Sequence, residues 1–377
     1  MNISDLRAQC AQSLLAGAKR ASGMTAFVGL DGFVDEILRA VDKRESAEVY
    51  QRLPTIARLA ERLAAAAGKS ANLELVSQMT KLGGNGPIMA NALASFDLKV
   101  TYLGLLGYPN LHPVFEEFAR RAEVHSIAPP GTTDALEFED GKIMVGKHGS
   151  LKQMTWENIQ ARFGREKFAA KFGSANLVGF VNWTMLPYMS NLWEALLKEI
   201  CPAMKGPRRI LFFDLADPEK RTQQDILRAL DLIGQFEKYF DVILGLNEKE
   251  AHEIGDVFGL KPKTPDADAL PDFGLRVAQN LKAGTLVIHP TASALAVSGG
   301  KVDMIDGPYV GRPLITTGAG DHFNSGFCLG KLLGLDNAQS LMTGVTTSGY
   351  YVRSGQSPTI TQLAGMMVDP SISYAKP

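Results

Sequence analysis

The feature that most limits the fold of this chain is the alternation of short, continuously apolar runs with segments of helical periodicity. Runs of this kind are typical of strands buried on both faces of a parallel sheet. They occupy residues 25–30, 100–106, 177–181, 210–215, 242–246 and 286–289. Helical segments precede and separate them, at residues 4–20, 54–67, 89–96, 192–200, 225–236 and 274–281. The alternation predicts an α/β fold of three layers, with helices on both faces of a mainly parallel central sheet.

One region departs from this alternation. Residues 132–147 form short alternating segments around Asp140 and Gly141, a strong signal for a hairpin turn. Antiparallel strands inside such a chain predict a small additional β sheet. We interpret it as a lid over the active site; an edge hairpin without a function is the alternative. We expect a single domain over residues 1–377, with lid elements at about 33–50 and 128–150.

Charge and cysteine content argue against several classes of protein. The 39 basic and 40 acidic residues give a formal net charge of −1, so no overall field favours nucleic acid or an anionic membrane. The cysteines Cys10, Cys201 and Cys328 lie far apart, which argues against a disulfide framework or a zinc site. No apolar stretch approaches the roughly 18 residues of a membrane span, and charges near the N-terminus argue against a signal peptide. We therefore expect a cytoplasmic protein.

The strongest candidate for chemistry is the segment ITTGAGDHFNSGF, which ends in an apolar helical run. Gly318 and Gly320 have no side chains, so the backbone can turn tightly and approach an anion closely. The helix that follows would direct its unpaired N–H groups and the positive end of its dipole into the turn. Such an anion hole suits the charge on a phosphoryl group during transfer.

The aspartate at the end of this turn needs its own explanation. A carboxylate there would repel a phosphate unless it had a chemical task, and accepting the proton of an attacking hydroxyl is such a task. We therefore predict that Asp321 is the catalytic base. The alternative is that Asp321 is an N-terminal cap of the helix in an ordinary glycine-rich turn. Spacing alone leaves both interpretations open.

The sequence TTGAGD, followed by Phe323 and then by Gly326 and Phe327, resembles the C-terminal signature of the PfkB (ribokinase-like) carbohydrate kinase family. The resemblance extends from about residue 25 to residue 360. It implies a ribokinase-like fold in which the backbone of Gly318, Ala319 and Gly320 forms the anion hole and Asp321 is the base. It also implies that ATP, with Mg²⁺, is the donor for phosphorylation of a hydroxyl on a small sugar-like substrate.

Two segments near the start of the chain resemble the family's substrate-binding elements. GGNGPIMANALASF resembles the N-terminal signature, in which the turn of Gly83 and Gly84, with Asn85, meets the substrate. VGLDGFVDEI resembles the first strand, whose Asp binds substrate hydroxyls. Asp35 fits that position best, and Asp31 is the second choice.

The nucleotide side follows the same resemblance. The segment NEKE resembles the family's NxxE motif, in which Asn247 and Glu250 organise Mg²⁺, its waters and the nucleotide phosphates. Thr317, His289 and Gly344 are assigned to the nucleotide pocket. For His289, contact with a phosphate or ribose is one interpretation, and a buried structural histidine at the end of a strand is the other.

Some positions depart from the family pattern. Ile315 stands where an Asp usually helps to hold a monovalent cation, so we do not expect potassium activation. Ile88 stands where many members have a substrate-contacting Asn. Asp214 and Asp217 follow another apolar run, and they either face the cleft or cap a loop.

Other functions stay open at this stage. The P-loop and dinucleotide-binding motifs GxxxxGK[ST] and GxGxxG are missing from the sequence. A nucleoside kinase of the same fold is one alternative to a sugar kinase, and a non-catalytic ligand-binding member is another. Relatives often dimerise through the lid sheet, so the resemblance leaves a homodimer as an expectation.

Overall fold

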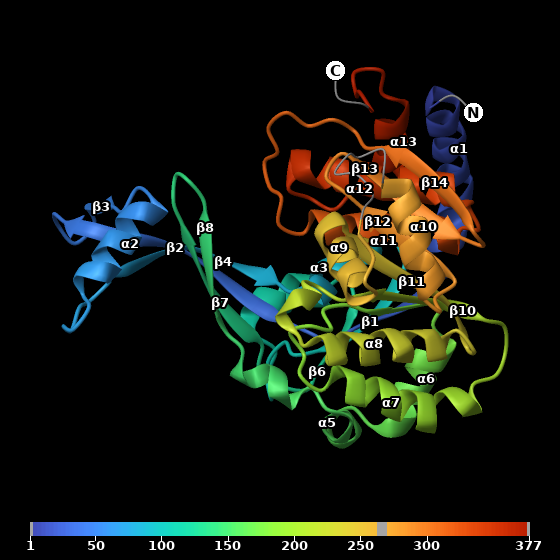
Figure 1. Ribbon diagram of the computed structural model, residues 1–377, viewed down its shortest axis with the longest axis horizontal. Coiled ribbons are helices and arrows are strands. Elements are labelled where there is room, and N and C mark those ends of the chain that lie inside the picture. Colours follow the sequence, from blue (N-terminus) through green and yellow to red (C-terminus); the bar gives the residue numbers. More distant parts are fainter. Residues whose placement is uncertain (1–2, 262–269, 375–377) are drawn as a thin grey trace.

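The structure, a computed structural model, describes residues 3–261 and 270–374. Within these residues the central sheet has nine strands in the order β14-β13-β12-β11-β10-β9-β1-β5-β6 (Figure 1). All pairs from β6 to β12 are parallel, and β13 and β14 add an antiparallel edge. This confirms the predicted mainly parallel sheet. The strands are β1 (Thr25–Gly29), β5 (Lys99–Gly104), β6 (Glu123–Ser126), β9 (Leu177–Phe180), β10 (Arg209–Asp214), β11 (Phe240–Asn247), β12 (Thr285–His289), β13 (Ser293–Ser298) and β14 (Lys301–Asp306).

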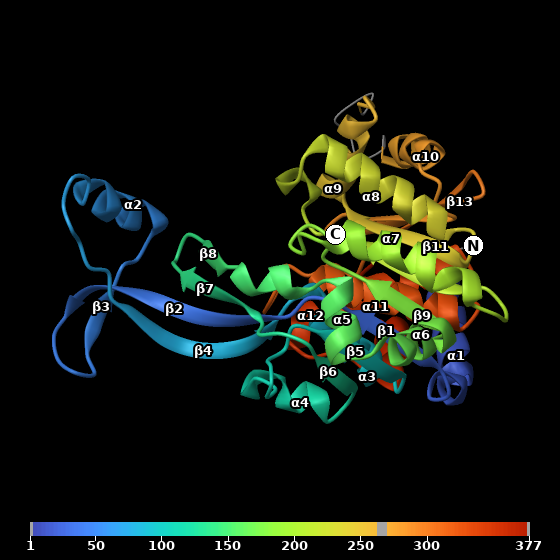
Figure 2. The same cartoon turned by 90° about the horizontal axis from the view of Figure 1, so that it is seen from below.

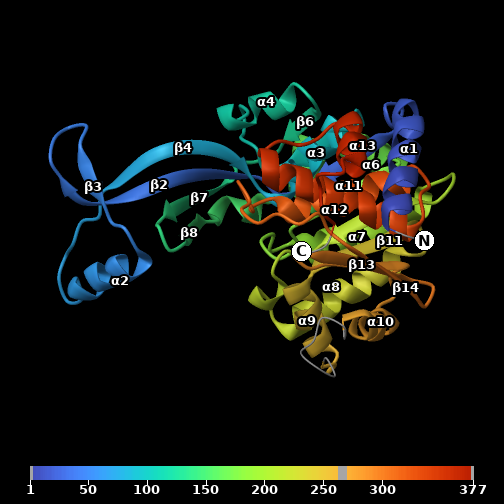
Figure 3. The ribbon, with the colours of Figure 1, turned by 90° about the horizontal axis from the view of Figure 1, so that it is seen from above.

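Helices cover both faces of this sheet, because side chains along each strand alternate between two apolar layers. On β10, Leu211 and Phe213 join one layer, and Phe212 joins the other. Figure 3 shows α1, α3, α11 and α13 on one side of the sheet and α8, α9 and α10 on the other. The first layer packs under α5 (Trp156–Arg162), α6 (Arg165–Ser174), α7 (Met189–Glu199), α8 (Gln223–Phe236), α9 (Glu248–Val257) and α10 (Leu270–Asn280). The second packs under α1 (Ile3–Ala21), α3 (Asn85–Ser95), α4 (Glu116–Ala119), α11 (Ala319–Leu332), α12 (Asn337–Ser354) and α13 (Ile360–Val368).

A second, smaller sheet projects from this body as an arm. It contains β2 (Phe33–Arg44), β3 (Tyr50–Arg52), β4 (Leu75–Gly83), β7 (Gly131–Glu137) and β8 (Lys142–Lys147). Strand β2 pairs antiparallel with β4 and parallel with β7, and β7 forms a hairpin with β8. Figure 2 shows β2 and β4 running away from the body, with β3 and α2 (Ile56–Ala65) at the tip. The predicted hairpin and small sheet are therefore confirmed.

The arm contains more of the chain than the sequence predicts. The expected lid ranges, 33–50 and 128–150, contain β2, β7 and β8, but they omit β4 and α2. Helix α2 was expected as one of the alternating helices of the α/β body. It instead covers a separate apolar cluster on the arm, in which Leu59 packs with residues such as Leu136 and Phe138. The arm thus has its own small core.

Two observations bear on the class of protein. None of the helices in the two described ranges is long and apolar enough to cross a membrane. Cys10, Cys201 and Cys328 are buried free thiols.

Candidate active site

The candidate active site lies where the carboxyl ends of the parallel strands meet the amino end of α11. Asp214 is the last residue of β10, and its Oδ2 accepts a 2.8 Å hydrogen bond from Nδ2 of Asn324 on α11. His289 ends β12, and its ring packs against Phe323 of α11 with 4.7 Å between ring centroids. In open α/β folds, this edge of the sheet is where ligands bind.

The glycine-rich turn begins α11 in a conformation that favours glycine. Gly318 is the N-cap residue, with a φ of +92°, and no side chain caps the helix. A Cβ at Gly318 would lie 3.3 Å from Cγ2 of Ile88 and from the Tyr351 hydroxyl. That hydroxyl donates to the Thr317 carbonyl at 2.9 Å. A side chain at Gly318 would therefore be both strained and crowded.

The amides of the turn differ in how they are paired. The Ala319 N–H donates to the Thr316 carbonyl at 3.1 Å. Helix geometry leaves the next amides, those of Gly320 and Asp321, without an intrahelical acceptor. These two amides are consequently better placed than that of Ala319 to meet an anion at the amino end of α11.

Asp321 lies in the first turn of α11, directly against the GGNG segment that begins α3. Its side chain is buried, and its Oδ1 accepts a 3.0 Å hydrogen bond from Nδ2 of Asn85. Burial, and then the charge of Asp214, raise the pKa of Asp321 well above its ordinary value, while the bond from Asn85 opposes this rise. Since Gly318 is the N-cap, the alternative of Asp321 as the capping residue does not fit the helix.

Asp31 supports the turn that carries Asn85. Its carboxylate accepts hydrogen bonds from the backbone N–H of Asn85 at 3.0 Å and of Gly86 at 2.9 Å. It also accepts one of 2.8 Å from Nδ2 of Asn182, and its side chain is completely buried. Burial raises the pKa of Asp31 to about 6. Protein donors occupy both oxygens of Asp31 and solvent does not reach them, so its contacts indicate support of the turn. The second-choice assignment of Asp31 to substrate binding stays a prediction.

Asp35, the preferred candidate, lies on β2 beside the double-glycine turn. A Cβ at Gly83 would come within 2.5 Å of Oδ2 of Asp35, so a side chain there would displace the Asp35 carboxylate. Gly84, the N-cap of α3, has a φ of +100°. Thr133 of β7 hydrogen-bonds to Asp35, and burial raises the pKa of Asp35 while Lys81 opposes the rise. The structure thus brings together Asp35, Gly83 and Gly84, next to Asn85.

Asn247 and Glu250 form a capping box at the start of α9. Oδ1 of Asn247 accepts from the Glu250 N–H, and Oε2 of Glu250 accepts from the Asn247 N–H, both at 2.9 Å. Oε1 of Glu250 accepts from the Asp217 N–H, also at 2.9 Å. Burial raises the pKa of Glu250. Burial, with the charge of Glu250 next, raises the pKa of Asp214 to about 8.

These contacts limit how a metal ion could bind. Within residues 3–261 and 270–374, no group of three or more His, Cys, Asp or Glu side chains is arranged to hold a metal ion. Each carboxylate oxygen of Glu250 has a second lone pair, which can accept a hydrogen bond from a metal-bound water. The donor set therefore fits water-mediated binding of Mg²⁺, an ion that commonly keeps several of its waters.

The remaining nucleotide-side candidates are packed against α11. A Cβ at Gly320 would lie 3.3 Å from Cε1 of His289. Burial lowers the pKa of His289 to about 4, and its buried Nε2 has no hydrogen-bond partner among the described residues. A Cβ at Gly344 of α12 would meet the Phe323 ring at 2.8 Å, so Gly344 permits close packing of the two helices. Nucleotide contacts by His289, Gly344 and Thr317 stay predictions.

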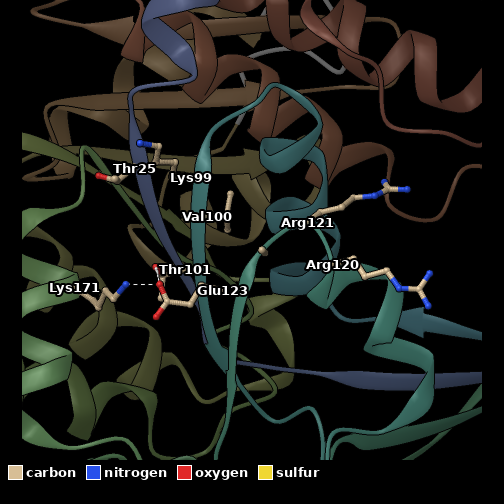
Figure 4. Close-up of a pocket in the computed structure, with 9 residues that line it drawn as sticks. Thr25, Lys99, Val100, Thr101, Arg120, Arg121, Glu123 and Lys171 are labelled. Carbon is tan, nitrogen blue, oxygen red and sulfur yellow. Dashed lines mark hydrogen bonds and ion pairs between the residues drawn. The ribbon is translucent and has the colours of Figure 1, made fainter.

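A cavity of about 420 Å³ lies elsewhere, at the amino ends of β1 and β5. Figure 4 shows Lys171 paired with Glu123 inside it, while Arg120 and Arg121 extend away from it. Its lining includes Thr25 and Lys99, the first residues of the two strands. It is therefore on the opposite edge of the sheet from Asp321.

Sequence reasoning missed several residues that shape the site. His322 and Tyr351 contact the backbone of the glycine-rich turn. Asn324 joins α11 to Asp214 across 110 positions of the chain. The polar residues His322 and Asn324 within an otherwise apolar helical run were the available signal, because a buried polar side chain needs a partner.

The architecture and the GAGD turn define the class of ribokinase-like carbohydrate kinases, and solved structures agree with this class. The ribokinase of Thermotoga maritima has a TM-score of 0.62, with 14% identity, over 92% of this chain and 99% of that chain. The Arabidopsis thaliana ribokinase, complexed with ribose and ATP, has a TM-score of 0.61, with 16% identity, over 91% and 98%. At such identities the likeness shows the fold, and it confirms the predicted one.

Within that class, the sequence model of prokaryotic ketohexokinase matches residues 4–369, and the chain belongs to this family. A ketohexokinase from Haloferax volcanii is 29% identical over 360 residues, which cover 94% of this chain and 92% of the relative. The predicted PfkB-family membership and the carbohydrate kinase class are thereby confirmed. Kinases of this family use ATP.

Proposed function

We propose that this protein transfers the γ-phosphoryl group of ATP to a hydroxyl of a ketohexose, with Asp321 as the general base. The observation that carries the proposal is the 3.0 Å hydrogen bond between Asn85 and Asp321. This bond joins the turn on the proposed substrate side to Asp321, at the end of the glycine-rich turn. Family membership and the ketohexokinase relative support the choice of a ketohexose.

In this proposal the side chains of Asp35 and Asn85 orient the sugar by hydrogen bonds to its hydroxyls. Asp321 accepts the proton of the attacking hydroxyl, and a carboxylate of raised pKa is the more effective base once it is ionised. The backbone of Gly318, Ala319 and Gly320 stabilises the charge of the transferred phosphoryl group. The amide of Gly320 is better placed for this than that of Ala319, which is paired with the Thr316 carbonyl.

Mg²⁺ belongs to the proposal as the ion that accompanies ATP. We assign Asn247 and Glu250 to it, through water. When bound, Mg²⁺ neutralises phosphate charge. Burial raises the pKa of Asp214 and of Glu250, and a cation beside them would favour the ionised form of both carboxyl groups.

A substrate screen tests the proposal. The purified protein is mixed with Mg·ATP and, separately, with fructose, ribose, fructose 6-phosphate and adenosine, and ADP release is measured. We expect release to depend on fructose and to be much slower with the other three compounds. Rapid release with adenosine alone would instead favour a nucleoside kinase. Binding of Mg·ATP without release across the panel would favour a non-catalytic member of the family.

A further inference from the structure

The residue that follows the proposed base, His322, has its ring against the glycine-rich turn. Its Nδ1 lies 2.7 Å from the Gly318 carbonyl oxygen, and its Nε2 lies 2.9 Å from Oγ of Ser357. A carbonyl oxygen can only accept, so Nδ1 carries the proton. In the neutral ring Nε2 is then the acceptor, and the Ser357 hydroxyl donates to it. Both ring nitrogens are thereby paired, and the tautomer is defined.

The side chain of Tyr351 contacts the same turn beside that of His322. The Tyr351 ring stacks on the His322 ring, with 3.7 Å between centroids and 11° between planes. The Tyr351 hydroxyl donates to the carbonyl of Thr317, the residue before Gly318. The stacked pair therefore holds two successive carbonyl groups of the turn. Burial lowers the pKa of His322 to about 4, so the ring stays neutral at physiological pH.

Holding these carbonyls also sets the direction of amides. A peptide unit is planar and trans, so its C=O and the following N–H point in opposite directions. Fixing the Thr317 carbonyl fixes the Gly318 N–H, and fixing the Gly318 carbonyl fixes the Ala319 N–H, which closes the turn by its bond to the Thr316 carbonyl. The free amides of Gly320 and Asp321 follow directly after this closed turn. The Gly318 carbonyl also accepts the helical bond from the backbone N–H of His322 at 3.1 Å, so the ring is its second donor. The side chains of Tyr351 and His322 thus reinforce the shape of the turn that leads into α11.

The other end of this arrangement reaches the substrate side. Nδ2 of Asn91, on α3, lies 3.5 Å from Oγ of Ser357. Ser95, also on α3, donates to the carbonyl of Pro358 at 2.7 Å. Helix α3 carries Asn85 at its amino end. The hydrogen bonds of His322 consequently connect the glycine-rich turn with the helix whose first residue contacts Asp321.

We propose that His322 is a positioning residue, whose Nδ1–H holds the Gly318 carbonyl and thereby keeps the shape of the turn, so that the free amides of Gly320 and Asp321 meet the transferred phosphoryl group. This inference rests on the proposed kinase function. His322 acts through the backbone and touches neither substrate. If His322 only filled space below the turn, a substitute would need to preserve only its volume and its stacking. The proposed role instead requires a hydrogen-bond donor at the place of Nδ1.

Two substitutions separate the roles of donor and volume. In His322→Asn the amide nitrogen can take the place of Nδ1 and donate to Gly318, whereas His322→Leu has no donor. We expect kcat for fructose phosphorylation to fall about 10²-fold in His322→Leu, as a misplacement of about 1 Å can cost this much. The KM for fructose should stay within about threefold, and His322→Asn should recover most of kcat. Thermal unfolding of each variant checks that it is folded.

Two kinetic results would overturn the proposal. One is a His322→Leu protein with the kcat of the wild type. The other is a His322→Asn protein that is as slow as His322→Leu while both are folded, since the donor would then be irrelevant. Tyr351→Phe, which keeps the stacked ring and loses the bond to Thr317, is expected to lower kcat as well, with the KM for fructose unchanged.

A measurement without any substrate separates this inference from the proposed function. In ¹⁵N-histidine-labelled protein, NMR should show His322 as the neutral Nδ1–H tautomer at pH 7, with its signals assigned by their loss in His322→Asn. An Nε2–H tautomer or a charged ring would overturn the inference whether or not a sugar is phosphorylated. If no compound in the screen is phosphorylated, the proposed function fails, and the tautomer still decides whether His322 holds the turn.

Discussion

At the scale of single residues, the site is dominated by carboxylates that burial keeps above their ordinary pKa values. Asp31, Asp214, Glu250 and Asp321 all share this direction, and burial is the largest cause in each case. A raised pKa means that ionising each carboxyl group is costly, and a nearby cation lowers that cost whereas a phosphate alone increases it. A nucleotide that arrives with a cation is therefore the better electrostatic match.

The pH dependence of stability should reveal Asp31. Its pKa rises from 3.8 to about 6 in the folded protein, so the folded state binds its proton more tightly than the unfolded state. The stability from this group is present below about pH 4 and is lost as the pH rises through about 6. We expect Asp31→Asn to have a lower free energy of unfolding but a shallower decline over this window. Urea unfolding at pH 4, 5, 6 and 7 measures both proteins, and equal slopes would contradict the assignment.

Sequence reasoning at this scale selected residues that the structure brings together where a residue type has few chemical uses, and their roles stay predictions. A glycine-rich turn that ends in Asp pointed to Asp321, and the double glycine pointed to the turn that Asn85 follows. Asp31 was harder to interpret, because an Asp after a strand binds a ligand or caps a helix with equal ease. Only the structure shows that its oxygens are occupied by α3 and Asn182.

At the scale of elements, the glycine-rich turn that begins α11 has little tolerance for an added side chain. Gly318 has a φ of +92° and little free space, whereas Gly334, after the end of α11, has a φ of +73° and nothing within 4 Å of an added Cβ. The two glycines are therefore a matched pair. Gly318 has a left-handed backbone conformation and lies in the candidate site. Gly334 has the same backbone conformation and lies outside the site.

Substituting each glycine by alanine should separate strain from function. Gly334→Ala should cost about 1 kcal/mol of stability and leave kcat unchanged. Gly318→Ala should cost at least as much and also lower kcat more than tenfold, because the new methyl group displaces Ile88 or Tyr351. Thermal unfolding and steady-state kinetics on both variants give the comparison. Equal kcat values would contradict a functional role for the shape of the turn.

The elements that sequence reasoning missed share a physical cause. Among the strands that the structure describes, β4 pairs only with β2, and most of its side chains are exposed, so it has no continuous apolar run. Helix α2 has the ordinary amphipathic pattern of a body helix, and nothing in that pattern says which surface it covers. The buried strands β9 and β10 were predictable because their surroundings are apolar on both faces.

At the scale of the whole molecule, the arm presents an apolar row that bears on the expected homodimer. Met79, Ile37, Ala135 and Met144 are successive cross-strand partners in β4, β2, β7 and β8, so their side chains share one face. Asp35, two residues before Ile37, is on this same face. Met79 and Met144 are 55% and 50% exposed. The homodimer itself stays a prediction from the family resemblance.

A pair of charge substitutions tests that prediction. If a second copy covers this face, Met79→Asp should convert a dimer into a monomer. Val145→Asp is the matched control, since Val145 is 47% exposed and, one position after Met144, points to the opposite face. Light scattering after size-exclusion chromatography measures the mass of each protein. A monomeric wild type, or a dimer that survives Met79→Asp, would contradict dimerisation through this face.

The central claim is that Asp321 removes the proton from the sugar hydroxyl, and one substitution tests it directly. Asp321→Asn keeps the size of the side chain and removes its basicity. We predict that kcat for fructose phosphorylation falls by about 10²–10⁴-fold, as expected for the loss of a general base, while the Kd of Mg·ATP measured by calorimetry changes less than about threefold. A variant that phosphorylates fructose at the wild-type rate would contradict the claim.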